Sequence, residues 1–389
     1  MDILQKLFES SGFGGDASLV WQNLVMFTIG GVLITLAVKK NFEPLLLIPI
    51  GFGAILANLP GAEMSAYSEA ADGGKWPLLG FVYTTAIKNA ELLPPIIFMG
   101  VGALTDFRPL LGRPITFLLG AAAQLGIFLA ALGAFYIFGF TLKEAASIGI
   151  IGGADGPTTI YLTAKLAPHL LGAVAVAAYS YMALVPVIQP PIIKLLTTQK
   201  EREIDMPQAR AVSKTAVVVF PIATCVLTVL FIPASGPLIG MLMFGNLIRE
   251  SGVTQRLSST ASGPLINIVT IFLGLIVGAT MEGKKFLMPD TLAILALGMV
   301  AFCFSTAGGV VFAKFLNVFL GEGKKINPCI GAAGVSAVPM ASRVVQNFVS
   351  KHTDGRVNPL MAAMGPNVAG VIGSAVSAGV FLSLIKALQ

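Results

Sequence analysis

The sequence predicts an all-α polytopic membrane protein made of two inverted repeats, each with five transmembrane helices and a broken or re-entrant helical hairpin. Three observations lead to this prediction. The chain of 389 residues is 55% hydrophobic and 11% charged, with a mean hydropathy of +0.85, whereas soluble domains carry about 25% charged residues. Its apolar runs are about twenty residues long, the length of a helix that spans a bilayer. Finally, two segments broken by glycine and proline share one sequence frame.

The shared frame occurs at residues 148–157, which read Ile-Gly-Ile-Ile-Gly-Gly-Ala-Asp-Gly-Pro, and at 330–339, which read Ile-Gly-Ala-Ala-Gly-Val-Ser-Ala-Val-Pro. Two glycines and the proline align at a constant offset of 182 residues, from 149 to 331, from 152 to 334 and from 157 to 339. A duplicated segment interrupted by Gly and Pro is typical of the binding site in transporters built from repeats.

Ten apolar segments are predicted as spans, at 19–38, 44–59, 77–104, 115–140, 170–197, 212–232, 235–249, 262–280, 289–319 and 359–385. The stretches 145–167 and 327–349 are broken and more polar, so we expect discontinuous helices there. Irregular backbone at membrane depth is tolerated only where protein buries it or water reaches it.

These segments divide the chain into an N-terminal interfacial segment 1–18, a first repeat 19–198, a charged linker 199–211 and a second repeat 212–389. Five crossings per repeat is an odd number, so the second copy should be inverted. The linker falls on the more basic side of this arrangement, which places it in the cytoplasm and both termini outside. The N-terminal segment lacks a basic region followed by an apolar core, so we expect no signal peptide there.

Several functional classes are disfavoured by the composition. The net charge of +6 has no accompanying aromatic-interleaved basic patch, so we expect no nucleic-acid binding. No Gly-x-x-x-x-Gly-Lys-Ser/Thr motif is present, which argues against ATP as the energy source within this chain. Cys225, Cys303 and Cys329 have no metal-site spacing, and we expect neither a disulfide nor a zinc site.

Asp155 is an acid within an apolar, glycine-rich run, where a charge is costly unless it has a function. It is predicted to be a cation ligand or a proton-coupled carboxylate, and the alternative is a helix cap or turn, since Asp-Gly-Pro is a good turn sequence. Asn327, Ser336 and Asn367 add neutral oxygens, and Asn327 and Asn367 also suit helix caps. One carboxylate with neutral oxygens favours a monovalent cation over Mg²⁺ or Ca²⁺.

Two further residues remain open to two interpretations. Tyr181 is either a packing or interfacial tyrosine or a proton relay near the site. Arg343 is either a cation that snorkels to the cytoplasmic rim or an anion-binding group that faces a cavity.

Four stretches of this chain closely resemble the β subunit of sodium-pumping, biotin-dependent decarboxylases, a family that includes oxaloacetate, methylmalonyl-CoA, glutaconyl-CoA and malonate decarboxylases. The stretches are Ala146–Leu171, Val174–Lys194, Lys325–Arg343 and Met364–Gly379. The resemblance implies that another subunit transfers a carboxyl group from the substrate to biotin. The β subunit then decarboxylates carboxybiotin, consumes a periplasmic proton and exports Na⁺.

The resemblance also implies site residues. It places the sodium-site aspartate on Asp155 and the two site asparagines on Asn327 and Asn367, and it implies roles for Tyr181, Gly331, Ser336 and Arg343, the last near the biotin path. Ala332 stands where some relatives carry a polar residue, which puts one peripheral ligand in doubt.

Further expectations concern partners and location. The resemblance implies a carboxyltransferase (α) subunit, a biotin-carrier subunit that presents carboxybiotin, a small membrane γ or δ subunit and a homo-oligomer in the complex, in the lipid of a bacterial inner membrane. The short loop at 60–77 favours an acyl-CoA decarboxylase complex. The competing interpretations are a stand-alone sodium-coupled organic-anion transporter and a membrane scaffold.

Overall fold

The computed structural model of the chain describes residues 17–40, 43–67, 77–89, 91–207, 209–321 and 323–388. Within these ranges every regular element is a helix, which confirms the predicted all-α class. Most of the predicted N-terminal segment 1–18 lies outside the described residues.

The first half of the chain forms α2 (Ala17–Lys40), α3 (Pro44–Ala57), α4 (Leu78–Val82), η1 (Tyr83–Asn89), α5 (Leu93–Leu104), α6 (Arg108–Gly112), α7 (Ile115–Ala123), α8 (Leu125–Tyr136), α9 (Leu142–Gly149), η2 (Ile150–Gly153), α10 (Gly156–Leu166), η3 (Pro168–Leu170) and α11 (Leu171–Leu196). The second half forms α12 (Gln199–Arg202), α13 (Lys214–Phe231), η4 (Pro233–Ser235), α14 (Gly236–Glu250), α15 (Gln255–Thr260), η5 (Ala261–Leu265), α16 (Ile266–Ala279), α17 (Gly283–Phe286), α18 (Pro289–Phe319), η6 (Pro328–Gly334), α19 (Met340–His352) and α20 (Leu360–Ala387). The elements η1 and η5 are π-helical and the other η elements are 3₁₀ helices.

Seven helical stretches in the described part of the chain are long and apolar enough to cross a membrane. They are Trp21–Lys40, Ile115–Tyr136, Pro168–Leu196, Lys214–Phe231, Gln255–Ala279, Pro289–Phe319 and Leu360–Ala387. The polytopic membrane character is therefore confirmed.

The other three predicted spans are shorter or bent. Helices α3 and α14 have 14 and 15 residues, below the roughly 20 that a straight crossing needs. The predicted span 77–104 bends by 72° between η1 and α5, and counting this pair as one span gives eight in the described residues. The count of ten spans stays a prediction.

Large apolar side chains are exposed along the outer helices. On α13 they include Val219, Ile222, Val226, Leu230 and Phe231, with exposed fractions from 50% to 83%. An apolar face of this size would be unfavourable in water. Lipid contact accounts for it, in agreement with the membrane class.

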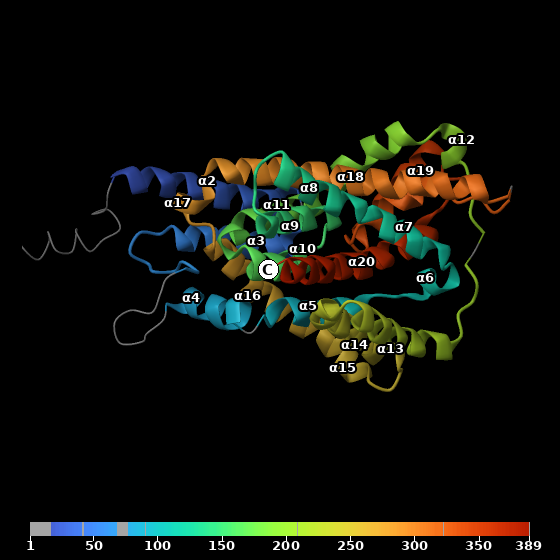
Figure 1. Cartoon of the computed structure of the whole chain (residues 1–389), viewed down its shortest axis with the longest axis horizontal. Coiled ribbons are helices and arrows are strands. Elements are labelled where there is room, and N and C mark those ends of the chain that lie inside the picture. Colours follow the sequence, from blue (N-terminus) through green and yellow to red (C-terminus); the bar gives the residue numbers. More distant parts are fainter. Residues whose placement is uncertain are drawn as a thin grey trace, which may run out of the picture.

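The long helices α2, α11, α18 and α20 lie along the long axis of the molecule, and α6, α12 and α19 gather at one end of it (Figure 1). We call this the linker end, because α12 belongs to the charged linker. There the Gln199 side chain donates to the His352 carbonyl at 2.6 Å. Helices α13 and α20 both start at the linker end and run toward the opposite end (Figure 1).

Candidate functional site

The first broken segment consists of α9, η2 and α10. Thr141 and Glu144 form a reciprocal capping box that starts α9. The α-helix α9 ends at Gly149, the 3₁₀ helix η2 follows to Gly153, and Ala154 takes a left-handed φ of 51°. Asp155 then caps α10, with a proline in its first turn. The segment is thus a pair of half-helices that meet at Asp155, as the sequence predicts.

Asp155 is only 6% exposed. Its Oδ1 accepts from the Thr158 backbone N–H at 3.1 Å and its Oδ2 accepts from the Ser374 hydroxyl at 2.5 Å. Among the residues that the structure describes, Asp155 has no salt bridge with a basic side chain. A buried carboxylate without a cationic partner is costly, so this position suits a bound cation or a proton.

The second broken segment contacts the first next to this acid. The Ser336 N–H donates to the Gly153 carbonyl at 2.8 Å, and the Ser336 hydroxyl donates to the Gly370 carbonyl at 2.8 Å. The Asn367 amide donates to the carbonyls of Val335 and Ala337 at 2.8 and 3.3 Å. The structure thus brings Asp155, Ser336 and Asn367 into one region, where both breaks meet α20.

Oxygen atoms without partners gather in the same region. The side-chain oxygens of Gln124, Thr158 and Asn367 are buried and accept no hydrogen bond from any described residue. Gln124 is held by donation to the Gly120 carbonyl at 2.9 Å and contacts Gly334 at 3.4 Å. Orphaned buried oxygens require an explanation such as water or an ion, and a monovalent cation prefers such neutral oxygens beside one carboxylate.

Asn327 lies with the linker instead. Its amide donates to the carbonyls of Arg202 and Ile204, both at 3.0 Å, and its Oδ1 accepts from the Cys329 N–H at 3.1 Å as the cap of η6. The structure therefore shows the predicted cap role of Asn327, which does not exclude the predicted ligand role. All three side-chain bonds are structural, and the residue ties the second broken segment to the linker.

The other predicted site residues are also separate from Asp155 in their contacts. Gly331 packs its backbone against that of Gly309 on α18, where no side chain would fit. Tyr181 donates its hydroxyl to the Leu295 carbonyl. Arg343 is exposed on the first turn of α19.

Sequence reasoning missed Ser374 and Gln124. The signal for Gln124 was present, since a buried amide within an apolar span needs a partner. Ser374 gave no comparable signal, because a small hydroxyl residue is ordinary in a membrane helix.

The profile of the family described as Na⁺-transporting oxaloacetate decarboxylase beta subunit matches residues 22–385. The chain belongs to this family.

Similar relatives cover nearly the whole chain. The oxaloacetate decarboxylase beta chain of Klebsiella pneumoniae is 52% identical, over 94% of this chain and 95% of the relative. The glutaconyl-CoA decarboxylase subunit beta of Acidaminococcus fermentans is 53% identical, over 98% and 97%. The methylmalonyl-CoA decarboxylase subunit beta of Veillonella parvula is 52% identical, over 98% of each.

Membership confirms the resemblance found in the sequence and favours a decarboxylase β subunit over a stand-alone transporter. The relatives are named as β chains or β subunits of oxaloacetate, glutaconyl-CoA and methylmalonyl-CoA decarboxylases, and such β subunits work within multi-subunit complexes. Their identities to this chain are nearly equal across the oxaloacetate and acyl-CoA types, at 52% and 53%.

Proposed function

We propose that this chain is the membrane β subunit of a biotin-dependent decarboxylase and couples the decarboxylation of carboxybiotin to Na⁺ export. One observation carries the proposal beyond family membership. Asp155 is a buried carboxylate at the meeting point of two broken helices, and its described partners are all neutral donors. A bound Na⁺ or a proton neutralises it, and only one of them can do so at a time.

The proposed sodium site consists of Asp155, Asn367 and Ser336, with Gln124 and Ser374 added from the contacts described above. The unpartnered oxygens of Gln124 and Asn367 support this set. The same region holds one negative charge, which balances one monovalent cation.

Asn327 and Gly331 remain in the proposal in another role. Asn327 anchors the second broken segment to the linker, and Gly331 lets that segment approach α18 closely. A direct ligand role for either residue stays a prediction.

Carboxybiotin is proposed to arrive at the linker end. A groove of about 660 Å³ lies there between α11 and α19, lined by prolines of α11 and by Val344, Phe348 and Lys351, a volume within the usual range for ligand pockets. Arg343 and Asn347 precede Lys351 at helical spacing on α19. An apolar groove with cationic groups beside it suits an apolar ring system that carries a carboxylate.

The reaction needs a proton. Decarboxylation breaks the N–C bond of carboxybiotin, the electron pair stays on the nitrogen, that nitrogen takes up a proton, and CO₂ leaves. Tyr181 and Arg343 are proposed to act on the proton and the carboxylate respectively. A proton released from the site when Na⁺ binds would link the two events, and moving one charge against 100 mV takes about 2.3 kcal/mol.

The proposed architecture is a pair of inverted repeats, 19–198 and 212–389, joined by the linker 199–211. Packing supports it. A side chain at Gly149 would meet the Ile127 carbonyl, and one at Gly331 would meet the Gly309 carbonyl. These two contacts are equivalent in the sequence repeat. Residues 149 and 127 of the first contact correspond to residues 331 and 309 of the second at the same offset of 182.

A second pair of contacts crosses between the halves. Gly152 lies against Ala301, and its counterpart Gly334 lies against the carbonyl of Leu119. The same offset of 182 relates 152 to 334 and 119 to 301. Each broken segment therefore packs on the other half in an equivalent way, as expected for two-fold related repeats.

The proposed assembly includes a carboxyltransferase (α) subunit, a biotin-carrier subunit, a small membrane γ or δ subunit and further copies of this chain, in the inner membrane of a bacterium with the linker in the cytoplasm. The near-equal identities to both types of relative support the inference that substrate choice belongs to the carboxyltransferase.

The central test uses the assembled complex in inverted vesicles. Asp155→Asn should abolish both ²²Na⁺ uptake and decarboxylation, and avidin should abolish uptake by the wild-type complex. Asp106→Asn is a matched control, because Asp106 is a partly exposed acid paired with Arg108. Wild-type uptake and decarboxylation in Asp155→Asn would refute the site, and uptake that avidin leaves intact would refute the decarboxylase role.

A further inference from the structure

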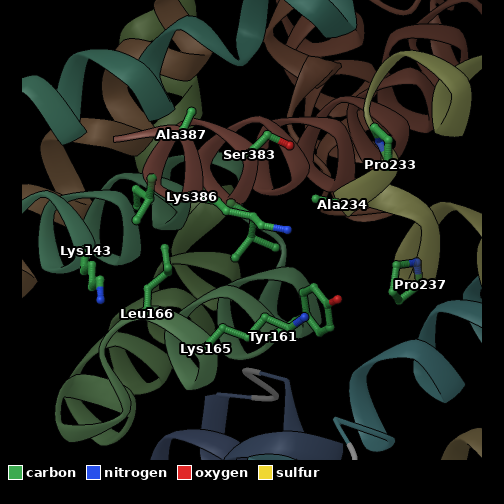
Figure 2. A pocket seen from close by; sticks show the side chains of 12 residues that line it. Lys143, Tyr161, Lys165, Leu166, Pro233, Ala234, Pro237, Ser383, Lys386 and Ala387 are labelled. Atoms are coloured by element: carbon green, nitrogen blue, oxygen red, sulfur yellow. The ribbon is translucent and has the colours of Figure 1, made fainter. Parts of the chain in front are cut away.

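A cavity of about 940 Å³ is lined by the C-terminal ends of α10 and α20, and α20 runs away from the linker end to reach it (Figure 1). It lies between the outer ends of α10 and α20 and the turn that joins α13 to α14. Figure 2 shows Tyr161 and Lys165 of α10 and Ser383 and Lys386 of α20 around the same space. The β-subunit activity described above does not by itself assign a role to this cavity.

The two helices that line the cavity also meet at Asp155. Farther from the cavity along both helices, Ser374 of α20 bonds to Asp155 at the start of α10. Both helices then run outward, and Lys165 and Lys386 near their ends line the cavity. At 1.5 Å per residue, the ten residues from Asp155 to Lys165 span about 15 Å. The α10–α20 seam therefore leads from the cavity to the carboxylate.

Buried hydroxyls without partners lie along α10 in this seam. Thr158 and Tyr161 are 0% and 2% exposed, and neither Thr158 Oγ1 nor the Tyr161 hydroxyl bonds to a described residue. Residues three apart share one face of a helix, so this face carries Thr158 one turn from Asp155 and Tyr161 at the cavity. Unpartnered buried hydroxyls are commonly satisfied by water.

We propose that this cavity is the outer mouth of a water-filled path that runs along α10 to Asp155, with Tyr161 at its narrowest point. Through this path the acid exchanges small cations, Na⁺ or hydronium, with the side away from the linker. The inference rests on the proposed role of Asp155 as the cation site.

The rim of the cavity is basic. Lys143, Lys165 and Lys386 line it, and only Lys165 is paired, with Glu91 at 2.7 Å, among the described residues. The Lys165 ammonium also lies 4.6 Å from the centre of the Tyr161 ring. A positive rim lowers the local concentration of cations, so it slows the return of exported Na⁺ from this side.

The test measures solvent access with Ag⁺, a thiol-reactive monovalent cation close to Na⁺ in size. Cys225, Cys303 and Cys329 are first replaced by Ala, and single cysteines are then introduced in the complex in sealed vesicles of both orientations. Modification is read as loss of later maleimide labelling after denaturation. This readout does not depend on decarboxylation.

Three positions report the geometry. Ser383→Cys at the mouth should react only from the side away from the linker, and Asn347→Cys, exposed in the linker-end groove, only from the linker side. Thr158→Cys, deep on α10, should react from the same side as Ser383→Cys. Thr116→Cys is the matched control and should stay unreactive, because Thr116 on α7 is equally buried and its hydroxyl is bonded to the Arg113 carbonyl at 2.7 Å.

The role of Tyr161 as the narrowest point of the path is tested in the Thr158→Cys variant. Tyr161→Ala removes the ring and should speed the reaction with Ag⁺, whereas Tyr161→Phe keeps the ring and should leave the rate unchanged. Faster reaction in both variants, or in neither, would refute the assignment of Tyr161.

Thr158→Cys that reacts only from the linker side, or from neither side while Ser383→Cys reacts, overturns the path. Whether Na⁺ protects Thr158→Cys from reaction with Ag⁺ distinguishes a failure of this proposal from a failure of the proposed function. Reaction from the expected side without protection by Na⁺ keeps the path and refutes Asp155 as the sodium site.

Discussion

The Ser374 hydroxyl on the last helix donates to Asp155 Oδ2 at 2.5 Å, across 219 residues of sequence. Thr158 holds the other carboxylate oxygen from within α10 itself. One oxygen of the acid is therefore fixed by its own helix and the other by the far end of the chain. The position of α20 relative to α10 sets the geometry of this carboxylate.

Ser374→Ala should weaken Na⁺ activation of decarboxylation. A hydrogen bond to a charged group contributes about 1.5–3 kcal/mol, so the Na⁺ concentration for half-maximal activity should rise by about tenfold or more. Ser377→Ala is the control, because Ser377 is equally buried on α20 and bonds within its own helix to Gly373. Equal effects of the two substitutions would contradict the role of Ser374.

Gly331→Ala should destabilise the protein. A methyl group there would meet the backbone of Gly309, which cannot move without displacing α18, and overpacking costs about 1–3 kcal/mol. The apparent Tm of the purified chain in detergent should fall by several degrees. Gly240→Ala, where the methyl group enters open space, should leave it unchanged. A normal Tm with impaired Na⁺ binding would instead indicate a direct ligand role for Gly331.

Asn327→Ala should loosen the linker. It leaves the carbonyls of Arg202 and Ile204 without this donor, at a cost of about 1–3 kcal/mol. Limited trypsin digestion should cleave after Lys200 or Arg202 several times faster than in the wild type, and Asn347→Ala on the exposed face of α19 should not change the rate. An unchanged cleavage rate together with weaker Na⁺ activation would contradict the anchoring role and support a direct ligand role for Asn327.

Glu201 gives a pH-dependent prediction. Partial burial raises its pKa, but hydrogen bonds from Thr198 and Lys314 outweigh this effect and hold the pKa below its usual 4.5. A carboxyl group whose pKa is lower in the folded than in the unfolded state stabilises the fold at pH values above the unfolded pKa. This stabilisation is lost as the pH falls through the folded pKa. Glu201→Gln should therefore lower the Tm slightly at neutral pH and converge with the wild type below pH 4.5. A constant difference at all pH values would contradict this.

The broken helices were predictable because their cause is local. The glycines at 149–153 and Pro157 interrupt the first segment, and the same frame interrupts the second. The bounds of α18 match the predicted span 289–319. In these cases composition and spacing decide the structure within a few turns of helix.

The partners of Asp155 depend on tertiary packing and were harder to predict. Ser374 bonds to Asp155 from a helix far away in sequence, and nothing in its local sequence marks it. Gln124 is a buried amide in an apolar span, but the sequence does not show which region of the fold its side chain reaches. Asn327 has the residue type of a ligand, but the linker folds back to take its amide. The count of ten spans stays a prediction, because hydropathy alone does not decide whether helices as short as α3 and α14 cross the membrane.

The bond between α10 and α20 also bears on how the protein is made. At 5–20 residues per second, the 219 residues between Asp155 and Ser374 take roughly 10–45 s to synthesise. For that interval the ribosome has delivered the acid but not its donor. The nascent first half must hold an unfinished polar centre in the bilayer until the final helix is inserted, and a chain truncated before α20 would keep that centre open to recognition by membrane quality control.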